Sequence, residues 1–367
     1  DERGARLSDF IESNKAGRNR TGVFGTLWRF GADEFHGALY ALFSLDIPRF
    51  THAPFLCVRA LVWAFRWHTL YSTIFFGIAF IVMSLAGGAI CRVAALQLAK
   101  AERPRLMQAV RFGTRKSVNL CLAPTTPIIG IILVALPFIA LLGLIGNLPV
   151  VGELLVGIFL PLALLAGGFI TIVLIGTVAG VNLMSPAIAY EDSDFFDAIA
   201  RAFAYVFARP WRMAFYTIIA ALYGAIGYIF VRFFGFLVLL TTYRFLQVGF
   251  LRRNEKLHEI WPEPTFATFP GPAGAMPDTW SLWLAALLIH LWVLLIVGLV
   301  VSFVISFYFS ANTIIYALLR YREDGTPLEE VYTSASGETA GPAPETVVPE
   351  PGRVMESKPQ EKHDTSG

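Results

Sequence analysis

Five long apolar stretches constrain the fold of this chain more than any other feature of its sequence. Each is about 20 residues long or longer, which is the length that a helix needs to cross a hydrocarbon core of about 30 Å. They run from about Leu70 to Cys91, Pro124 to Gly146, Leu154 to Leu183, Met213 to Leu240 and Leu282 to Phe309. Only 15% of the 367 residues are charged, against roughly 25% in soluble domains. The sequence therefore predicts an all-α, polytopic integral membrane protein built as a helical bundle.

The number of spans depends on how the longer stretches are read. The third and fourth exceed one crossing, so we expect them to tilt, kink or project beyond the lipid. Pro137 and Pro161 are the expected kink points, because proline removes a helix hydrogen bond. Arg232 interrupts the fourth stretch. The prediction is five spans, or six if the chain breaks at Arg232.

The two ends of the chain differ from this central part. Residues 1–68 contain two short, interrupted apolar segments, EFHGALYALFSLDIP and PFLCVRALVWAFRWH, which predict interfacial amphipathic helices or, alternatively, a re-entrant hairpin. Residues 69–321 then form the transmembrane domain. Residues 322–367 carry ten acids and four bases with few large apolar groups, which predicts an acidic, mostly disordered tail.

The distribution of bases predicts the orientation. The connector over 92–116 has seven Arg and Lys against one acid, and short loops this basic stay in the cytoplasm. Counting five spans from there also places the C-terminus in the cytoplasm. The same count leaves two basic segments outside, one at 252–256 and one at Arg59 and Arg66. An extra span or a re-entrant hairpin would remove that conflict.

The stretch SPAIAYEDSDFFDAIARAFAYVFARPW (185–211) predicts an amphipathic helix on the cytoplasmic face between two spans. Asp192, Ser193 and Asp194 are helix N-cap residues, and Pro210 ends the pattern. Asp197 lies four residues before Arg201, the favourable order for an ion pair. One helical face holds the apolar side chains Phe195, Phe196, Ile199, Phe203, Val206 and Phe207. Trp211 is the expected aromatic anchor where the chain re-enters the membrane.

This connector, which we call an elbow, has two counterparts in the sequence. When Glu102, Glu191 and Glu323 are aligned, each follows a span. Each also precedes a short segment in which an apolar residue is followed by an acid or amide, then by any residue, and then by another apolar residue. The pattern predicts a repeated unit of a span followed by an elbow, although amphipathic helices can share such a pattern by chance.

Two quoted stretches also carry a resemblance. GGAICRVAALQLAKAERPRLMQAVRFG and the 185–211 stretch resemble signature segments of uncharacterised bacterial multi-pass membrane proteins, with GGAI-x-R-x-A-A and E-x-x-D-x-F-D-A motifs. The second stretch is more loosely similar to the membrane domain of some bacterial glycerophosphodiester phosphodiesterases. The resemblance covers about residues 85–230 and implies a membrane fold in the bacterial inner (cytoplasmic) membrane. It implies no activity, because the phosphodiesterase catalytic barrel has no counterpart in this sequence.

Three groups of residues are candidate sites. Bases of the first elbow beside the membrane can attract anionic lipid headgroups, or simply set the topology: Arg103, Arg105, Arg111, Arg115 and Lys116. Small residues at helical spacing allow close helix packing, within the chain or between copies: Gly176 with Gly180, and Ser84 with Gly88. Four polar residues lie in or at the ends of spans: Asn182, Arg232, His290 and Asn312. We expect interhelical hydrogen bonds from the two asparagines and His290, and snorkelling of Arg232 towards the interface. Alternatively, the asparagines line a polar path, His290 relays protons or holds a metal, and Arg232 faces a cavity or pairs with an acid.

Catalytic chemistry has little support in the sequence. Cys57, Cys91 and Cys121 match no metal or redox spacing, and we expect no cofactor, metal site or nucleic-acid partner. The favoured hypothesis is a non-catalytic scaffold or accessory subunit that binds membrane lipids or other membrane protein subunits. A small-solute transporter or channel is the alternative. A membrane-embedded lipid enzyme, the third hypothesis, requires that some of these acids and histidines come together: Glu34, His36, Glu102, Glu191 and His258.

Overall fold

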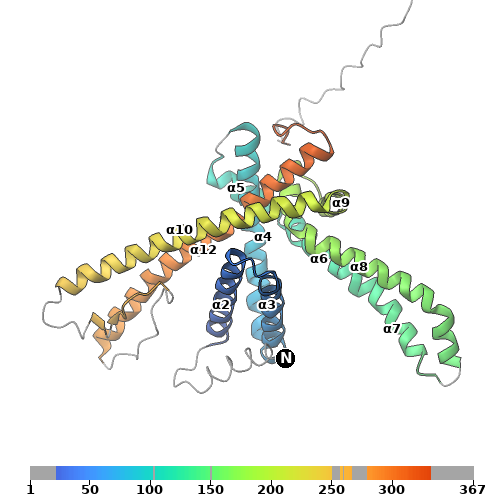
Figure 1. Ribbon diagram of the computed structural model, residues 1–367, viewed down its shortest axis with the longest axis horizontal. Helices are drawn as coiled ribbons and strands as arrows, with labels where there is room; N and C mark the ends of the chain where they lie inside the picture. The colour runs from blue at the N-terminus through green and yellow to red at the C-terminus, as the bar shows by residue number, and fades with distance from the viewer. Residues whose placement is uncertain are drawn as a thin grey trace, which may run out of the picture. The chain divides into compact units, whose positions relative to one another are not determined.

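The computed structural model describes residues 22–101, 104–148, 151–249, 257–258, 260–266 and 279–331. These residues are mostly helical, with no strand among them (Figure 1). The all-α prediction is confirmed for this part of the chain. The predicted tail beyond Ser334, together with Glu102 and Arg103, lies outside the described residues.

In the described residues, α2 (Val23–Phe43) and α3 (Ile47–Trp67) precede the first long apolar helix. They pack against each other as a helical hairpin. Leu45 adopts a left-handed conformation (φ 57°) in the tight turn, and the Asp46 carboxylate accepts a hydrogen bond from the Arg49 backbone N–H at 3.1 Å. This cap satisfies one of the free N–H groups at the start of α3. The predicted amphipathic segments are therefore helical, and they pair with each other.

Among the described residues, four helices are long and apolar enough to cross a membrane: α4 (Thr69–Lys100), α8 (Val151–Glu191), α10 (Pro210–Gly249) and α12 (Trp280–Glu323). At 1.5 Å per residue, the 41 residues of α8 extend about 60 Å, twice the thickness of a hydrocarbon core. The helices continue beyond the apolar stretches that predicted them. α10 runs through Arg232 without a break, so the position that suggested a sixth span lies inside one helix.

The second predicted span is bent and irregular. α5 (Leu106–Arg115) meets the following helix at an angle of 52°, and the pair counts as a fifth candidate span if it is taken as one. α6 (Ser117–Gly130) then continues through a π-helical turn, η1 (Ile131–Ala135), into α7 (Leu136–Ile145). The π-turn lies just before Pro137. Because proline lacks the N–H that the preceding turn needs, it accounts for the local change in helix geometry there.

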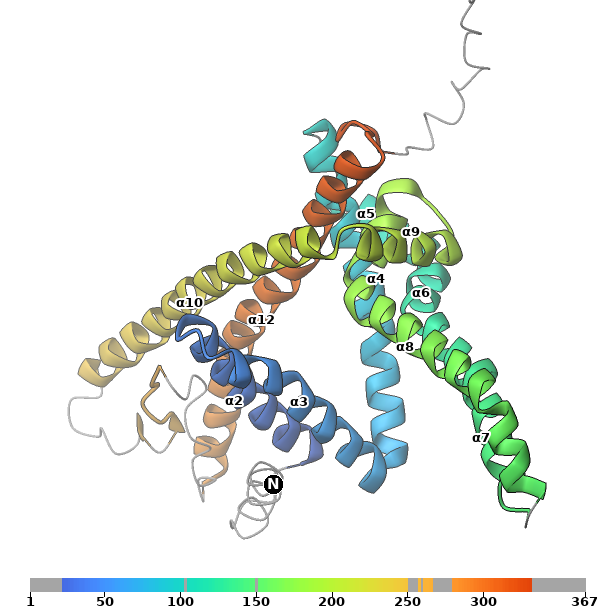
Figure 2. The same ribbon diagram turned by 45° about the vertical axis from the view of Figure 1, so that its right-hand side comes forward.

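The main hydrophobic core lies where the ends of α4, α8 and α12 meet α5, α6 and α9 (Phe195–Ala208). Its fully buried residues include Leu183, Met184, Ile188, Tyr316 and Leu319. A smaller core joins α10 and α12 near Leu239 and Val300. By contrast, the most apolar 18 residues of α8 include no buried residue. In the corresponding 18 residues of α12, only 11% are buried. The packed interior is thus concentrated at the end of the bundle that carries the elbows, α5 and α9 (Figures 1 and 2).

Candidate functional site

The elbow α9 forms as the sequence predicts, and its buried side combines alanines with part of the predicted apolar face. Asp194 is the N-cap residue, and the helix ends at Ala208, before Pro210. The buried residues are Ala198, Ala202, Tyr205 and Val206, whereas Phe196 is 66% exposed and Phe207 is also exposed. Of the predicted apolar face, Val206 is buried and Phe195, Ile199 and Phe203 pack against the main core, while Phe196 and Phe207 lie on the exposed side. The alanines are buried as well, because small side chains let the helix backbones approach closely.

Gly176 and Gly180 of α8 receive this elbow helix. A Cβ at Gly176 would lie 3.0 Å from the Phe203 ring, and one at Gly180 would lie 3.4 Å from Ala202 and Val206. The predicted small-residue face is thus used for packing within the chain, against an amphipathic helix. A side chain at Gly88 would likewise overlap Leu120 of α6, while Ser84 is half-buried on the same helix.

An ionic cluster surrounds the end of α8, and Glu191 is its centre. The Glu191 carboxylate lies 2.7 Å from the Arg201 guanidinium of α9 and 3.3 Å from the Arg320 guanidinium of α12. It also accepts a hydrogen bond of 2.6 Å from the Tyr316 hydroxyl. The Glu191 side chain is 11% exposed and that of Arg320 12% exposed, so this contact is shielded from water. Arg201 also pairs with Asp197 at 3.1 Å, as predicted.

Asp192 connects the two elbows within this cluster. It adopts a left-handed conformation (φ 55°) and pairs with Arg115 at 3.0 Å and Lys116 at 3.2 Å, at the end of α5. Lys116 also donates to the Asp192 backbone carbonyl at 2.6 Å. Arg92 of α4 donates to the Ala189 carbonyl at 2.6 Å. These contacts hold the ends of α4, α5 and α8 together.

The acids after α12 make equivalent contacts. The Glu323 carboxylate lies 2.9 Å from Arg209 and 3.7 Å from Arg212. The neighbouring Asp324 accepts a hydrogen bond of 2.5 Å from the Tyr205 hydroxyl. Glu191 and Glu323, which the sequence aligned as repeats, therefore each pair with two arginines. The third elbow differs from the prediction, because the described residues after Glu323 form turns rather than a helix.

The surroundings of α9 shift the pKa values of two of its groups. Burial and the Asp324 carboxylate raise the pKa of Tyr205 well above its ordinary value of 10, so the phenol stays protonated into the alkaline range. Burial disfavours the charge on Arg201, but the Glu191 and Asp197 carboxylates outweigh it and raise the pKa of that guanidinium. Both shifts favour the protonated forms that make the observed contacts.

The predicted lipid-binding bases divide into two sets. Arg115 and Lys116 are engaged with Asp192, whereas Arg105 and Arg111 of the first elbow are exposed. Beside these two bases, α5 exposes Leu106 (82%), Met107 (76%) and Val110 (46%), while Ala109 and Phe112 are buried. An apolar face flanked by exposed bases is the arrangement of an interfacial helix.

The four polar residues predicted within spans have different environments. Asn182 of α8 accepts a hydrogen bond from the Tyr308 hydroxyl of α12, as expected of an interhelical contact. Asn312 donates within its own helix, to the Tyr308 carbonyl at 2.9 Å. His290 is exposed, and the interhelical hydrogen bond expected of it is not seen among the described residues.

Arg232 corrects our prediction that it snorkels to the interface. Its side chain is buried, with an exposure of 7%, and donates to the Tyr228 hydroxyl at 3.0 Å and the Phe266 carbonyl at 2.7 Å. The guanidinium also lies 4.9 Å from the centre of the Phe266 ring. His36 of α2 reaches the same Tyr228 hydroxyl at 2.9 Å, which links the hairpin to α10.

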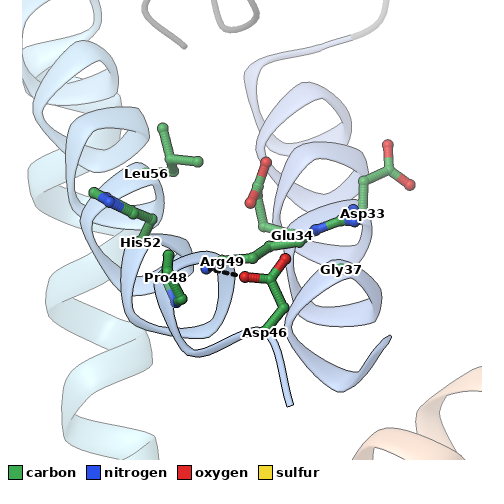
Figure 3. Close-up of a pocket in the computed structure, with 8 residues that line it drawn as sticks. All are labelled: Asp33, Glu34, Gly37, Asp46, Pro48, Arg49, His52 and Leu56. Atoms are coloured by element: carbon green, nitrogen blue, oxygen red, sulfur yellow. Dashed lines mark hydrogen bonds between the residues drawn. The ribbon is translucent and has the colours of Figure 1, made fainter. Parts of the chain in front are cut away.

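A polar pocket of about 410 Å³ lies between α2 and α3. Figure 3 shows its lining residues on the two helices, and they are Asp33, Glu34, Gly37, Asp46, Pro48, Arg49, His52 and Leu56. The Arg49 side chain extends from α3 to α2, where its guanidinium would be 3.6 Å from a Cβ at Gly37. The pocket thus combines three carboxylates with an arginine and a histidine.

The acids and histidines named for a lipid enzyme do not form one site in the described part of the chain. Glu34 and His36 lie on the hairpin, whereas Glu191 is surrounded by arginines and Tyr316. The described residues contain no group of three or more His, Cys, Asp or Glu side chains that could hold a metal ion.

Comparisons with protein-family models, curated proteins and solved structures found no match to this chain. The resemblance to bacterial multi-pass membrane proteins therefore stays a prediction. The structure itself defines the class: the described part of the chain is all-helical and has four helices long and apolar enough to cross a membrane, or up to five if the bent pair is one span.

Several residues of the ionic cluster escaped the sequence analysis. Tyr205, Tyr316 and Arg320 lie in helical segments whose sequence carries no recognisable motif. Their common signal is position: each is within about two helical turns of an elbow, near one of the aligned glutamates. A search for polar residues around Glu191 and Glu323 would have found them.

Proposed function

We propose that this chain is a non-catalytic scaffold or accessory subunit of the bacterial cytoplasmic membrane, with its elbows on the cytoplasmic side. The observation that carries the proposal is that the packed core lies at the ends of the long helices and not along their apolar spans. Ion pairs and the main core fix the helix ends, while the apolar windows of α8 and α12 stay largely unburied. Such faces are available to lipid and to helices of other membrane proteins.

The exposed face of α5 supports the lipid part of this proposal. Leu106 and Met107 can enter the headgroup region while Arg105 and Arg111 attract anionic lipids, each base contributing about 1 kcal/mol near the surface. Arg115 and Lys116 form ion pairs with Asp192. Because they lie next to the exposed bases, they contribute mainly to the positive electrostatic potential of this surface.

Photo-crosslinking tests the partner part of the proposal. A photoreactive amino acid at Leu165, which is 71% exposed on α8, should capture a partner membrane protein in native membranes. The matched control is Ile188 on the same helix, which is fully buried and should crosslink only within the chain. A chain that yields no partner from Leu165 or from other exposed α8 positions, and that remains a lone species after gentle solubilisation, would contradict the scaffold role.

Cysteine accessibility tests the orientation. In a background without the three native cysteines, an impermeant thiol reagent on intact cells should label Leu148→Cys, after α7, and not Thr114→Cys, on α5. Both positions are exposed, so permeabilised cells should label both. Labelling of Thr114→Cys in intact cells would place the elbows outside.

A small-solute transporter is the second candidate, and one observation favours it. The pocket of the hairpin contains Asp33, Glu34 and Arg49, and the hairpin contacts the buried Arg232 through Tyr228 and His36. Ionisable groups close to membrane helices are functional candidates. Proteoliposomes should then accumulate a charged solute, and Glu34→Gln should abolish uptake. Equal uptake by both proteins, or none across a panel of amines and organic acids, would exclude this pocket as the transport site.

A further inference from the structure

An apolar groove of about 390 Å³ lies where α8, α9 and α10 meet. Its lining comes from three elements: Val178, Ala179 and Asn182 of α8, Val206 of α9, and Pro210, Met213, Ala214, Thr217 and Ile218 of α10. α9 connects the two long helices, which leave it in different directions (Figures 1 and 2). The groove is therefore the space that opens between α8 and α10 beside the elbow.

The volume and the lining of the groove indicate what can occupy it. A volume of 390 Å³ falls at the lower end of the range for small-ligand pockets, about 300–1,000 Å³. The lining consists mainly of aliphatic groups, so a single alkyl chain matches both its volume and its chemistry.

Polar groups lie at defined places along this groove. The Asn182 side-chain oxygen accepts from Tyr308, and its amide N–H₂ has no partner among the described residues, so it can donate to an ester carbonyl. Thr217 donates its hydroxyl proton to the Met213 carbonyl, which leaves the oxygen as an acceptor. An apolar groove with one amide donor matches an acyl chain that ends in a glycerol ester better than it matches a plain hydrocarbon.

Two arginines flank the lining residues at the elbow end. Arg209 precedes Pro210 and Arg212 precedes Met213, and their side chains are 49% and 44% exposed. Both approach the same Glu323 carboxylate, so the trio carries one surplus positive charge. Trp211, between them, is 87% exposed, as an interfacial anchor would be.

We propose that this groove binds one acyl chain of an anionic phospholipid, with the ester at Asn182 and the phosphate at Arg209 and Arg212. The site is separate from the α5 face. The inference rests on the membrane location within the proposed function and is independent of the scaffold role. The bound lipid fills the space between α8 and α10 that the protein itself leaves open.

A photoactivatable anionic phospholipid, with its reactive group in the acyl chain, tests the site in nanodiscs of full-length protein. We expect crosslinks concentrated at 178–182 and 213–218. Ala214→Phe should reduce them about tenfold, because the exposed Ala214 position admits a ring into the groove without disturbing the core. Ile226→Phe, on an exposed part of α10, is the matched control and should leave them unchanged.

The headgroup is tested with Arg209→Gln/Arg212→Gln, in which the preference for anionic over zwitterionic probe should fall about tenfold. Crosslinks spread evenly along α8 and α10, or undiminished in Ala214→Phe, would overturn the proposal. So would a crosslink from the groove to a second copy of the chain or to another protein in place of the lipid. Partner capture at Leu165 is measured in the same variants, so that loss of the lipid site and failure of the scaffold role are separately visible.

Discussion

The Glu191 carboxylate of α8 lies 2.7 Å from the Arg201 guanidinium of α9, ten residues further along the chain. Because the left-handed Asp192 turns the chain between them, this pair closes the corner where a long apolar helix gives way to an elbow. Arg320 and Tyr316 bring α12 to the same carboxylate. One acid thus fixes three helix ends, which explains why the core is concentrated there.

Removing this charge should weaken the whole end of the bundle. Glu191→Gln leaves Arg320 without its counter-charge in a shielded position, and loss of one partner from a buried pair costs roughly 3–5 kcal/mol. Thermal melting of the purified protein measures the change. Glu329→Gln, at an exposed carboxylate, is the control and should stay within about 0.5 kcal/mol of the wild type. Equal melting temperatures for the two variants would show that Glu191 does not hold the cluster together.

Two buried tyrosines should respond in opposite ways to loss of their hydroxyl groups. Tyr190 and Tyr316 pack with ring centres 5.8 Å apart. Tyr316 donates to Glu191, so Tyr316→Phe should cost roughly 1.5–3 kcal/mol. The Tyr190 hydroxyl is buried without a hydrogen-bond partner among the described residues, so Tyr190→Phe should be neutral or stabilising by about 1 kcal/mol. Denaturant titration compares them, and a larger loss for Tyr190→Phe would contradict the assignment.

Close packing of α5 on α4 depends on Gly113. A Cβ at this position would lie 2.7 Å from the Leu85 backbone carbonyl oxygen, which cannot move without displacing α4. Gly113→Ala should therefore cost about 1–3 kcal/mol through overpacking. Gly167 of α8 faces open space, so Gly167→Ala should gain about 0.5–1 kcal/mol from helix propensity. Melting temperatures that shift in the same direction for both variants would show that the contact is not tight.

Alkaline pH should destabilise the contact between α9 and the turn after α12. The folded protein holds the pKa of Tyr205 above the ordinary value of 10, so above pH 10 the unfolded chain loses this proton while the folded chain keeps it. The free energy of unfolding then falls as the pH rises. Tyr205→Phe should make this fall shallower. Tyr321→Phe, at an exposed hydroxyl, serves as the control, and an unchanged slope in Tyr205→Phe would sink the prediction.

Much of the helical architecture was predictable, because lipid-length apolar runs and helix caps are local signals. The extent of α9 followed from Asp194 and Pro210, and its Asp197–Arg201 pair from their spacing. The alignment of Glu191 with Glu323 also anticipated that both acids would have similar roles. By contrast, the buried face of α9 could not be predicted from hydrophobicity alone. Gly180 receives Ala202 and Val206, and Gly176 receives the Phe203 ring, whereas Phe196 and Phe207 stay exposed.

The sequence alone determined that this chain forms long apolar helices separated by charged elbows, because span length, capping and charge spacing act over a few turns of one helix. Only the tertiary structure decided which charges pair, that Arg232 is buried against Tyr228 and Phe266, and that a groove opens between α8 and α10. Those features depend on residues far apart in the sequence, such as Tyr316 and Glu191 at a separation of 125. Contacts at that range arise from how helices meet, and no periodicity within a single helix encodes them.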